Sequence, residues 1–249
     1  MDRWINKVAI VTGASSGIGE AIVKDLVKKN LKVVGLARRL DKMEKLKNDL
    51  KNEKGAFFPI QCDVSQEEDI LKAFSWIEKQ LDGVDILINN AGKCTMDLTI
   101  ESSTKNYRQI LDVNLIGPAI CTREAVRIMR ARNSSGHIIY INSVLGQNVE
   151  FFKTTACNLY APSKFAQRAM AQIIELELQH VKSNIKITNI CPGLVKTEMP
   201  AKECFEYHNY VLAEDISDGV IYALSTPPHV QVKELTITPG PTRIQSIQL

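Results

Sequence analysis

The chain of 249 residues lacks long apolar runs and dense clusters of either charge. No stretch approaches the roughly 20 consecutive apolar residues that a bilayer-spanning helix needs, so we expect no membrane span. Lysine and arginine (31) exceed aspartate and glutamate (28) by only three, which argues against nucleic acid as a partner. Residues 1–7 lack the apolar segment of a secretory signal. We therefore expect a cytoplasmic protein.

The cysteines and histidines lack the spacing that metal sites need. The six cysteines form no C-x-x-C pair, and no two of the four histidines lie at ligand spacing. This pattern argues against a structural zinc site and a disulfide framework, and we predict no metal. With 45% apolar and 24% charged residues, the composition is that of a globular protein. The length suits one large domain over residues 1–249.

What the chain does have is an alternation of short apolar strands and longer helices. Strands are predicted at residues 7–12, 32–37, 56–61, 85–89, 137–142, 186–191 and 234–238. Helices are predicted at residues 18–29, 41–52, 65–81, 105–113, 115–132, 160–180 and 215–224, the second and third opening with capping boxes. Strand–helix–strand units give a parallel sheet covered on both faces. The predicted fold is a single α/β domain, doubly wound around a sheet of about seven strands.

The turn between the first strand and the first helix reads Thr12-Gly13-Ala14-Ser15-Ser16-Gly17-Ile18-Gly19. Gly13 suits a tight exit from the strand, Gly17 leaves room for a diphosphate, and Gly19 permits close packing of helix on sheet. The helix N-terminus adds amides and positive potential for an anion. The G-x-x-x-G-x-G spacing differs from the G-x-G-x-x-G fingerprint. The strand–turn–helix context, typical of a Rossmann fold, nevertheless predicts a bound dinucleotide.

The end of the second strand distinguishes between two dinucleotides. NAD sites usually place an acid about 20 residues beyond the glycines, where it binds the ribose 2′-hydroxyl. This chain has Ala37-Arg38-Arg39 there, and Asp41 is assigned to the helix cap. Guanidinium groups match a 2′-phosphate in charge and shape. The alternative is that both arginines are solvated surface charges. NADP(H) is the predicted cofactor.

Tyr160-Ala161-Pro162-Ser163-Lys164 opens a predicted helix, and Pro162 suits its first turn. Tyr160 and Lys164 then share one helix face. A phenol has a pKa of about 10. An ammonium at about 4 Å stabilises the phenolate by roughly 4 kcal/mol at an effective dielectric near 20. Such a pair brings the phenol towards general acid–base catalysis, although most pairs at this spacing are surface neighbours.

Three further stretches accompany the glycine turn and Tyr160-x-x-x-Lys164. They are Asn89-Asn90-Ala91-Gly92, the pair Asn142-Ser143, and Cys191-Pro192-Gly193-Leu194-Val195-Lys196-Thr197. Together, these motifs resemble those of the classical short-chain dehydrogenases/reductases, in order and over almost the whole chain. Residues 1–4, 120–125 and 224–227 are similar to the branch of dehydrogenase/reductase member-11-like carbonyl reductases and insect farnesol dehydrogenases.

The resemblance implies four catalytic residues. Tyr160 would exchange a proton with the substrate oxygen, and Lys164 would lower its pKa and hold the nicotinamide ribose. Ser143 would hydrogen-bond the substrate oxygen and stabilise its developing charge. Asn114, in the helix before the fifth strand, would help to hold a water that relays protons past Lys164.

The resemblance also implies a cofactor set. Asp63 and Val64 would border the adenine, residues 90–92 the adenosine-side ribose, and Val195 and Thr197 the nicotinamide carboxamide. The full set comprises Gly13, Ser15, Ser16, Gly17, Ile18, Gly19, Arg38, Arg39, Asp63, Val64, Asn90, Ala91, Gly92, Val113, Tyr160, Lys164, Pro192, Gly193, Val195 and Thr197.

The predicted substrate walls are residues 93–98, 144–152, Leu159 and a substrate loop at about 198–212. Their larger apolar and aromatic members are Met96, Leu98, Val144, Leu145, Phe151, Phe152, Met199, Phe205, Tyr207 and Tyr210. A mostly apolar pocket suits lipophilic alcohols and carbonyls. The predicted function is NADP(H)-dependent interconversion of such an alcohol and its aldehyde or ketone. Farnesol-like isoprenoids, retinoids, steroids and xenobiotic carbonyls all remain open as substrates.

Two alternative functions were considered for this chain. A non-catalytic NADP(H)-binding redox sensor would have no use for Tyr160. A sugar-nucleotide epimerase or dehydratase of the extended relatives is disfavoured by the glycine spacing and by the lack of a C-terminal substrate domain. The family pairs the helices that begin near residues 115 and 160 across two-fold axes, so we expect a homodimer or a homotetramer.

Overall fold

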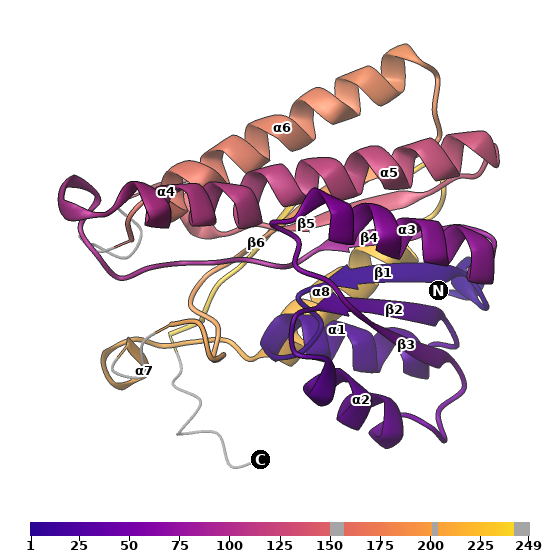
Figure 1. The fold of residues 1–249 in the computed structure, drawn as a ribbon, viewed down its shortest axis with the longest axis horizontal. Coiled ribbons are helices and arrows are strands. Elements are labelled where there is room, and N and C mark those ends of the chain that lie inside the picture. The colour runs from indigo at the N-terminus through magenta and orange to yellow at the C-terminus, as the bar shows by residue number, and fades with distance from the viewer. Residues whose placement is uncertain (150–156, 201–203, 242–249) are drawn as a thin grey trace.

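The computed structural model describes residues 1–149, 157–200 and 204–241, and is built on one seven-stranded sheet (Figure 1). The strands are β1 (Val8–Thr12), β2 (Lys32–Ala37), β3 (Ala56–Gln61), β4 (Ile86–Asn89), β5 (His137–Ile141), β6 (Lys186–Pro192) and β7 (Glu234–Ile237). Their order is β3-β2-β1-β4-β5-β6-β7, and every neighbouring pair is parallel. The predicted doubly wound fold is confirmed.

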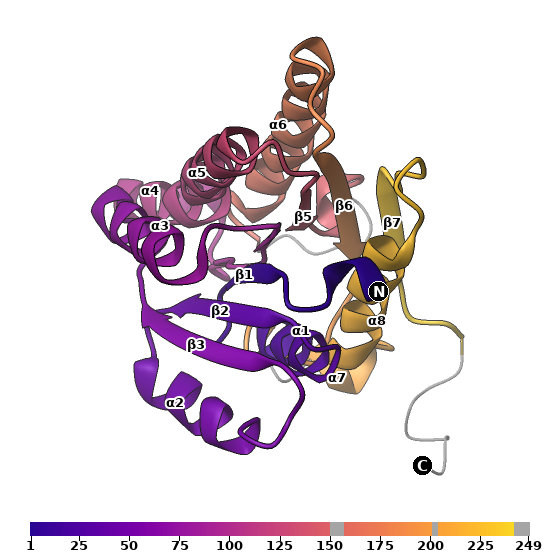
Figure 2. The same cartoon turned by 90° about the vertical axis from the view of Figure 1, so that its right-hand side faces the viewer.

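Helices cover both faces of the sheet, as Figure 2 shows. One face carries α1 (Gly17–Lys28), α2 (Leu40–Asp49) and α8 (Ala213–Ser225), and the other carries α3 (Glu67–Leu81), α5 (Gly117–Ala131) and α6 (Tyr160–His180). Successive strand residues point to opposite faces. In β1, Ala9 and Val11 join the first core and Val8 and Ile10 the second, all of them buried. Burial on both faces explains why the strands read as continuous apolar runs.

The helical stretch before β5 contains a π-helical turn, where two separate helices were predicted. Helix α4 (Thr104–Leu111) continues through the turn η3 (Asp112–Ile116) directly into α5. Such turns insert an extra residue into a helix and occur frequently at functional sites. Here the turn contains Asn114, whose side chain is fully buried.

Both predicted capping boxes at helix starts are wrong. Helix α2 is preceded by Arg39, so Asp41 lies within the first turn rather than at the cap. Helix α3 is preceded by Gln66, because Ser65 belongs to the turn before it. The carboxylate of Asp63 accepts hydrogen bonds from the backbone N–H and the hydroxyl of Ser65, at 3.0 and 2.8 Å. Short polar side chains often prefer such local turns to a capping position.

The parallel strands bring their carboxyl ends to one edge of the sheet. The chain order reverses between β1 and β4, and in open α/β sheets ligands bind at such a switch point. The loops that follow β1, β4, β5 and β6 all leave from this edge. They carry the glycine turn, Asn90, Ser143 and Thr197, respectively. Over the described residues, every helix is too short or too polar to cross a membrane.

Candidate active site

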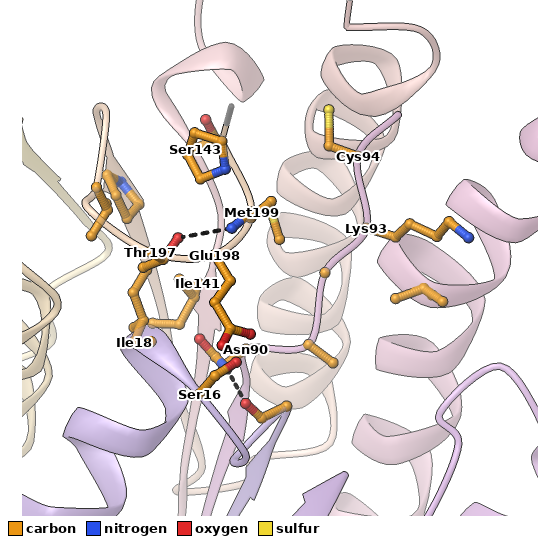
Figure 3. A pocket seen from close by; sticks show the side chains of 18 of the residues that line it. Ser16, Ile18, Asn90, Lys93, Cys94, Ile141, Ser143, Thr197, Glu198 and Met199 are labelled. Carbon is orange, nitrogen blue, oxygen red and sulfur yellow. Dashed lines mark hydrogen bonds between the residues drawn. The ribbon is translucent and has the colours of Figure 1, made fainter. Parts of the chain in front are cut away.

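A cleft of about 760 Å³ runs along the carboxyl edge of the sheet. It is lined by every predicted cofactor residue except Gly19, and by Ser143, Tyr160 and Lys164 of the predicted catalytic set. Figure 3 shows Ser16, Asn90 and Glu198 towards one end of this pocket and Ser143 towards the other. Segments far apart in the sequence thus meet in one elongated cleft.

The glycine turn is packed tightly against the loop after β4. The Asn90 side-chain amide donates to the Thr12 carbonyl at 2.8 Å, and the Thr12 hydroxyl accepts from the backbone N–H of Ala91 at 2.9 Å. Gly13 has a φ of +68°, and a Cβ there would lie 2.9 Å from the Ala91 Cα. A Cβ on Gly19 would lie 2.3 Å from the Gly13 carbonyl oxygen. Gly19 therefore allows close packing beneath the cleft. Asn90 connects the loop after β4 to the glycine turn.

The start of α1 meets the loop after β6. Gly17 has a φ of +56°, and a Cβ on it would lie 2.9 Å from the Thr197 side chain. Ser16 precedes the helix, and its side chain makes no capping hydrogen bond. The first backbone amides of α1 are therefore not occupied by that hydroxyl and can bind a ligand. A glycine cradle at a helix N-terminus fits a dinucleotide diphosphate. The residues present therefore fit a dinucleotide cofactor.

Arg39 is bonded to the glycine turn and does not extend freely into solvent. Its guanidinium donates to the Ser15 hydroxyl at 3.1 and 3.2 Å and to the Ser16 hydroxyl at 2.6 Å. A third contact joins it to the Glu198 carboxylate at 2.8 Å, and Lys42 binds the same carboxylate at 2.9 Å. Arg38 also lines the cleft. The sequence analysis placed Glu198 in the substrate loop without predicting these contacts. It missed Lys42, which lies 156 positions from Glu198.

Tyr160 and Ser143 both line the cleft. Burial raises the pKa of Tyr160 above its ordinary value, and the hydroxyl of Ser143 opposes that shift. The lowering of the Tyr160 pKa by Lys164, helped by the charge of the oxidised nicotinamide, stays a prediction. In the structure, the Lys164 ammonium donates to the Ile141 carbonyl at 2.8 Å, and lies 5.8 Å from the Tyr160 ring centre. Burial lowers the pKa of Lys164 from 10.5 to about 8.

Asn114 lies behind the cleft and does not line it. Its side-chain oxygen accepts from the Lys93 backbone N–H at 2.8 Å, and its amide donates to the Lys93 carbonyl and the Ser163 hydroxyl, each at 2.9 Å. Its own carbonyl accepts from the Gln167 amide at 3.0 Å. The oxygen of Gln167 in turn accepts from Lys164 at 3.3 Å. Asn114 and Lys164 are thus linked through Gln167.

Sequence analysis missed Gln167, although one signal was present. It lies three positions after Lys164, and therefore on the same face of α6, which further along buries Ala171 and Leu178. A fully buried glutamine needs partners for both ends of its amide. The available clue was a polar residue on a helix face whose neighbouring positions are apolar and buried.

Gln167→Met, which nearly preserves volume, should destabilise the fold by roughly 1–3 kcal/mol, because it leaves the buried Asn114 carbonyl without this donor. The measurement is the urea midpoint at pH 7. Gln172→Met on the exposed face of α6 is the matched control, and its midpoint should stay close to wild type. Equal midpoints for wild type and Gln167→Met would contradict the role of this link.

The substrate end of the cleft is only partly as predicted. Met96, Leu145 and Met199 line it, whereas Leu98, Val144, Phe205 and Tyr210 are not among the lining residues. Phe205 and Tyr210 pack edge to face at 5.4 Å. Phe151, Phe152 and the Tyr207 side chain lie outside what the structure describes. Within the predicted wall ranges, the pocket also contains Lys93, Cys94, Pro200, Cys204 and His208. Cys157 lines it too and lies outside those ranges.

Known proteins resemble this chain in sequence and in structure. A family model described as short chain dehydrogenase matches residues 7–206. Farnesol dehydrogenase of Aedes aegypti is 46% identical over 242 residues, covering 96% of this chain and 98% of that protein. Dehydrogenase/reductase SDR family member 11 of Bos taurus is 40% identical over 252 residues, covering 96% and 98%. The closed form of serine dehydrogenase complexed with NADP+ has a TM-score of 0.85 at 26% identity, covering 97% and 98%. These similarities confirm the predicted family resemblance and its branch.

Proposed function

The chain belongs to the short-chain dehydrogenase family of oxidoreductases, and from this premise we propose that it interconverts a lipophilic alcohol and its aldehyde or ketone with NADP(H). The observation that carries the proposal is the arrangement of one cleft. Arg39 and the glycine turn lie in the same cleft as Ser143, Tyr160 and Lys164. One cleft thus offers phosphate-binding groups for a dinucleotide and a proton donor for a substrate beside it.

The proposed mechanism assigns one task to each side chain. A nicotinamide bound in this cleft would supply or accept the hydride. In the reductive direction, the Tyr160 hydroxyl donates its proton to the substrate oxygen, while the Ser143 hydroxyl hydrogen-bonds the same oxygen. Lys164 has a pKa lowered to about 8, so it can lose and regain a proton near neutral pH. Its proximity to Tyr160 makes it the group that restores the proton of the phenol.

The substrate class follows from the walls of the cleft and from the relatives. Met96, Leu145 and Met199 contribute flexible apolar surface, which suits an isoprenoid, retinoid, steroid or xenobiotic carbonyl. One relative is named for farnesol. We also propose a single cytoplasmic domain that self-associates. Helix α6 supports self-association, since its Ile173 and Leu176 are exposed by 54% and 60%.

The test of the proposed function is the absorbance at 340 nm of the purified protein with NADPH or NADH. The panel contains aldehydes, ketosteroids and quinones, and the reverse assay uses NADP+ with farnesol, retinol and hydroxysteroids. Turnover with NADPH well above that with NADH is expected. Tight NADPH binding without turnover on any substrate would overturn the proposal in favour of the redox sensor.

Arg39→Gln should weaken NADP+ binding by roughly 10- to 100-fold, because the phosphate loses charge-assisted hydrogen bonds. NAD+ binding should change little. Arg38→Gln is the matched control, and we expect a smaller effect because Ser15 and Ser16 orient only Arg39 towards the glycine turn in the described structure. Titration calorimetry measures both. A larger loss for Arg38→Gln would reassign the phosphate contact.

A further inference from the structure

A carboxylate from the substrate loop already binds the cations at the end of β2. Glu198 follows β6, and its two oxygens lie 2.8 Å from Arg39 and 2.9 Å from Lys42. Figure 3 shows its side chain extending from the β6 loop towards Ser16 at the glycine turn. Arg39 binds Ser15 and Ser16 with its remaining nitrogens. Two cations therefore bind one carboxylate, and one of them is held in place by two hydroxyls of the glycine turn.

The Glu198 carboxylate keeps its charge at every pH of ordinary assays. Hydrogen bonds from Arg39 and Lys42 lower its pKa to about 2. Arginine, lysine and hydroxyl groups are also the donors that recognise a phosphate. The Glu198 carboxylate is an anion bound by an arginine and a lysine, two of these donor types.

An incidental surface ion pair is the rival explanation, since such pairs contribute little stability. All three side chains are indeed more than 40% exposed. However, the backbone that carries Glu198 is anchored, because the adjacent Thr197 packs against Gly17. Glu198 also lines both the main cleft and a neighbouring cavity of about 490 Å³ that contains Lys42, Lys45 and Lys196. The carboxylate therefore lies in the wall between two cavities.

We infer that Glu198 is an internal counter-ion of the 2′-phosphate site, which a 2′-phosphate must displace from Arg39 and Lys42. This inference rests on the proposed NADP(H) dependence. A dinucleotide with a free 2′-hydroxyl brings no competing anion and leaves the ion pairs in place. Glu198 therefore reduces the preference for NADP(H) over NAD(H). Because it belongs to the loop that borders the substrate, it also links phosphate binding to the position of that loop.

The test compares two ligands that differ only in the 2′-phosphate, adenosine 2′,5′-bisphosphate and 5′-AMP. Titration calorimetry of Glu198→Gln should show roughly 5- to 20-fold tighter binding of the bisphosphate than in wild type, because the competing charge is gone. Binding of 5′-AMP should change less than about twofold. Glu206→Gln, an exposed glutamate on α7 (Cys204–Tyr207), controls for the loss of one negative charge nearby. It should leave both affinities unchanged.

The outcomes separate this inference from the proposed function. Wild type that binds the bisphosphate no better than 5′-AMP would refute NADP(H) dependence itself. If wild type binds the bisphosphate more tightly than 5′-AMP, but Glu198→Gln binds the bisphosphate no more tightly than wild type does, only the counter-ion role of Glu198 would be overturned. Arg39→Gln should abolish the gain caused by Glu198→Gln, since the two groups act through one contact.

Amide exchange provides a readout that is independent of affinity. Without ligand, residues 196–200 should exchange faster in Glu198→Gln than in wild type, because the anchoring ion pairs are lost. Adenosine 2′,5′-bisphosphate should change the exchange of these residues in wild type, and 5′-AMP should not. The same response to both ligands would contradict displacement by the phosphate.

Discussion

Tyr160→Phe is expected to lower kcat by roughly 10²- to 10⁴-fold, the range that a general acid or base contributes. The phenylalanine keeps the ring and its packing but removes the proton that would be donated to the substrate oxygen. Steady-state rates at 340 nm measure the loss, and quenching of protein fluorescence by NADPH shows whether the cofactor still binds.

Tyr140→Phe is the matched control for the removal of a phenolic oxygen. Tyr140 is fully buried in β5, and its hydroxyl lies 2.7 Å from that of Thr122. Its loss should cost stability of about 1 kcal/mol while kcat remains near wild type. If Tyr160→Phe kept more than about a tenth of wild-type kcat, Tyr160 would not be the acid. Loss of NADPH binding in that variant would point to a structural defect.

The strands were predictable because burial on both faces marks them in the sequence. The predicted and observed bounds of β2 (Lys32–Ala37) and β3 (Ala56–Gln61) are identical. Helix starts were less accurate, because several local hydrogen bonds compete there. Ser65 illustrates the point, since its hydroxyl binds Asp63 of the preceding turn and does not cap α3.

The motif residues meet because their loops leave the same edge of a parallel sheet, which a sequence pattern can anticipate. Contacts made by side chains across loops were not predictable in this way. Glu198 and Arg39 pair over 159 positions, and Gln167 reaches the Asn114 carbonyl over 53. The pKa of Tyr160 also depends on its burial, which sequence spacing does not show. The hydrogen bond from Lys164 to the Ile141 carbonyl was equally unpredictable. The assigned catalytic roles stay predictions.

Lys164→Met should abolish most activity, and its stability relative to wild type should be greater at pH 7 than at pH 10. The Lys164 side chain is only 2% exposed, and burial lowers its pKa from 10.5 to about 8. Below pH 8, folding therefore buries an ammonium that the unfolded chain keeps in water. This cost is about 3 kcal/mol. The variant also loses the hydrogen bonds to Ile141 and Gln167, which offsets part of its gain.

The dependence on pH isolates the charge from those hydrogen bonds. Between pH 8 and 10.5, the folded wild type has released the Lys164 proton while the unfolded chain still holds it, so wild-type stability rises with pH. The methionine variant has no such proton. Its free energy of unfolding relative to wild type should therefore fall by about 2–3 kcal/mol between pH 7 and pH 10.

Urea unfolding at a series of pH values, without added cofactor, measures this difference. Lys72→Met on the exposed surface of α3 is the control, and its stability relative to wild type should stay flat over the same range. A flat profile for Lys164→Met would mean that Lys164 keeps an ordinary pKa and cannot exchange protons near neutrality as proposed. A falling profile together with lost turnover would show that the site retains a buried, easily deprotonated lysine at the expense of stability, as expected for a group kept for its chemistry.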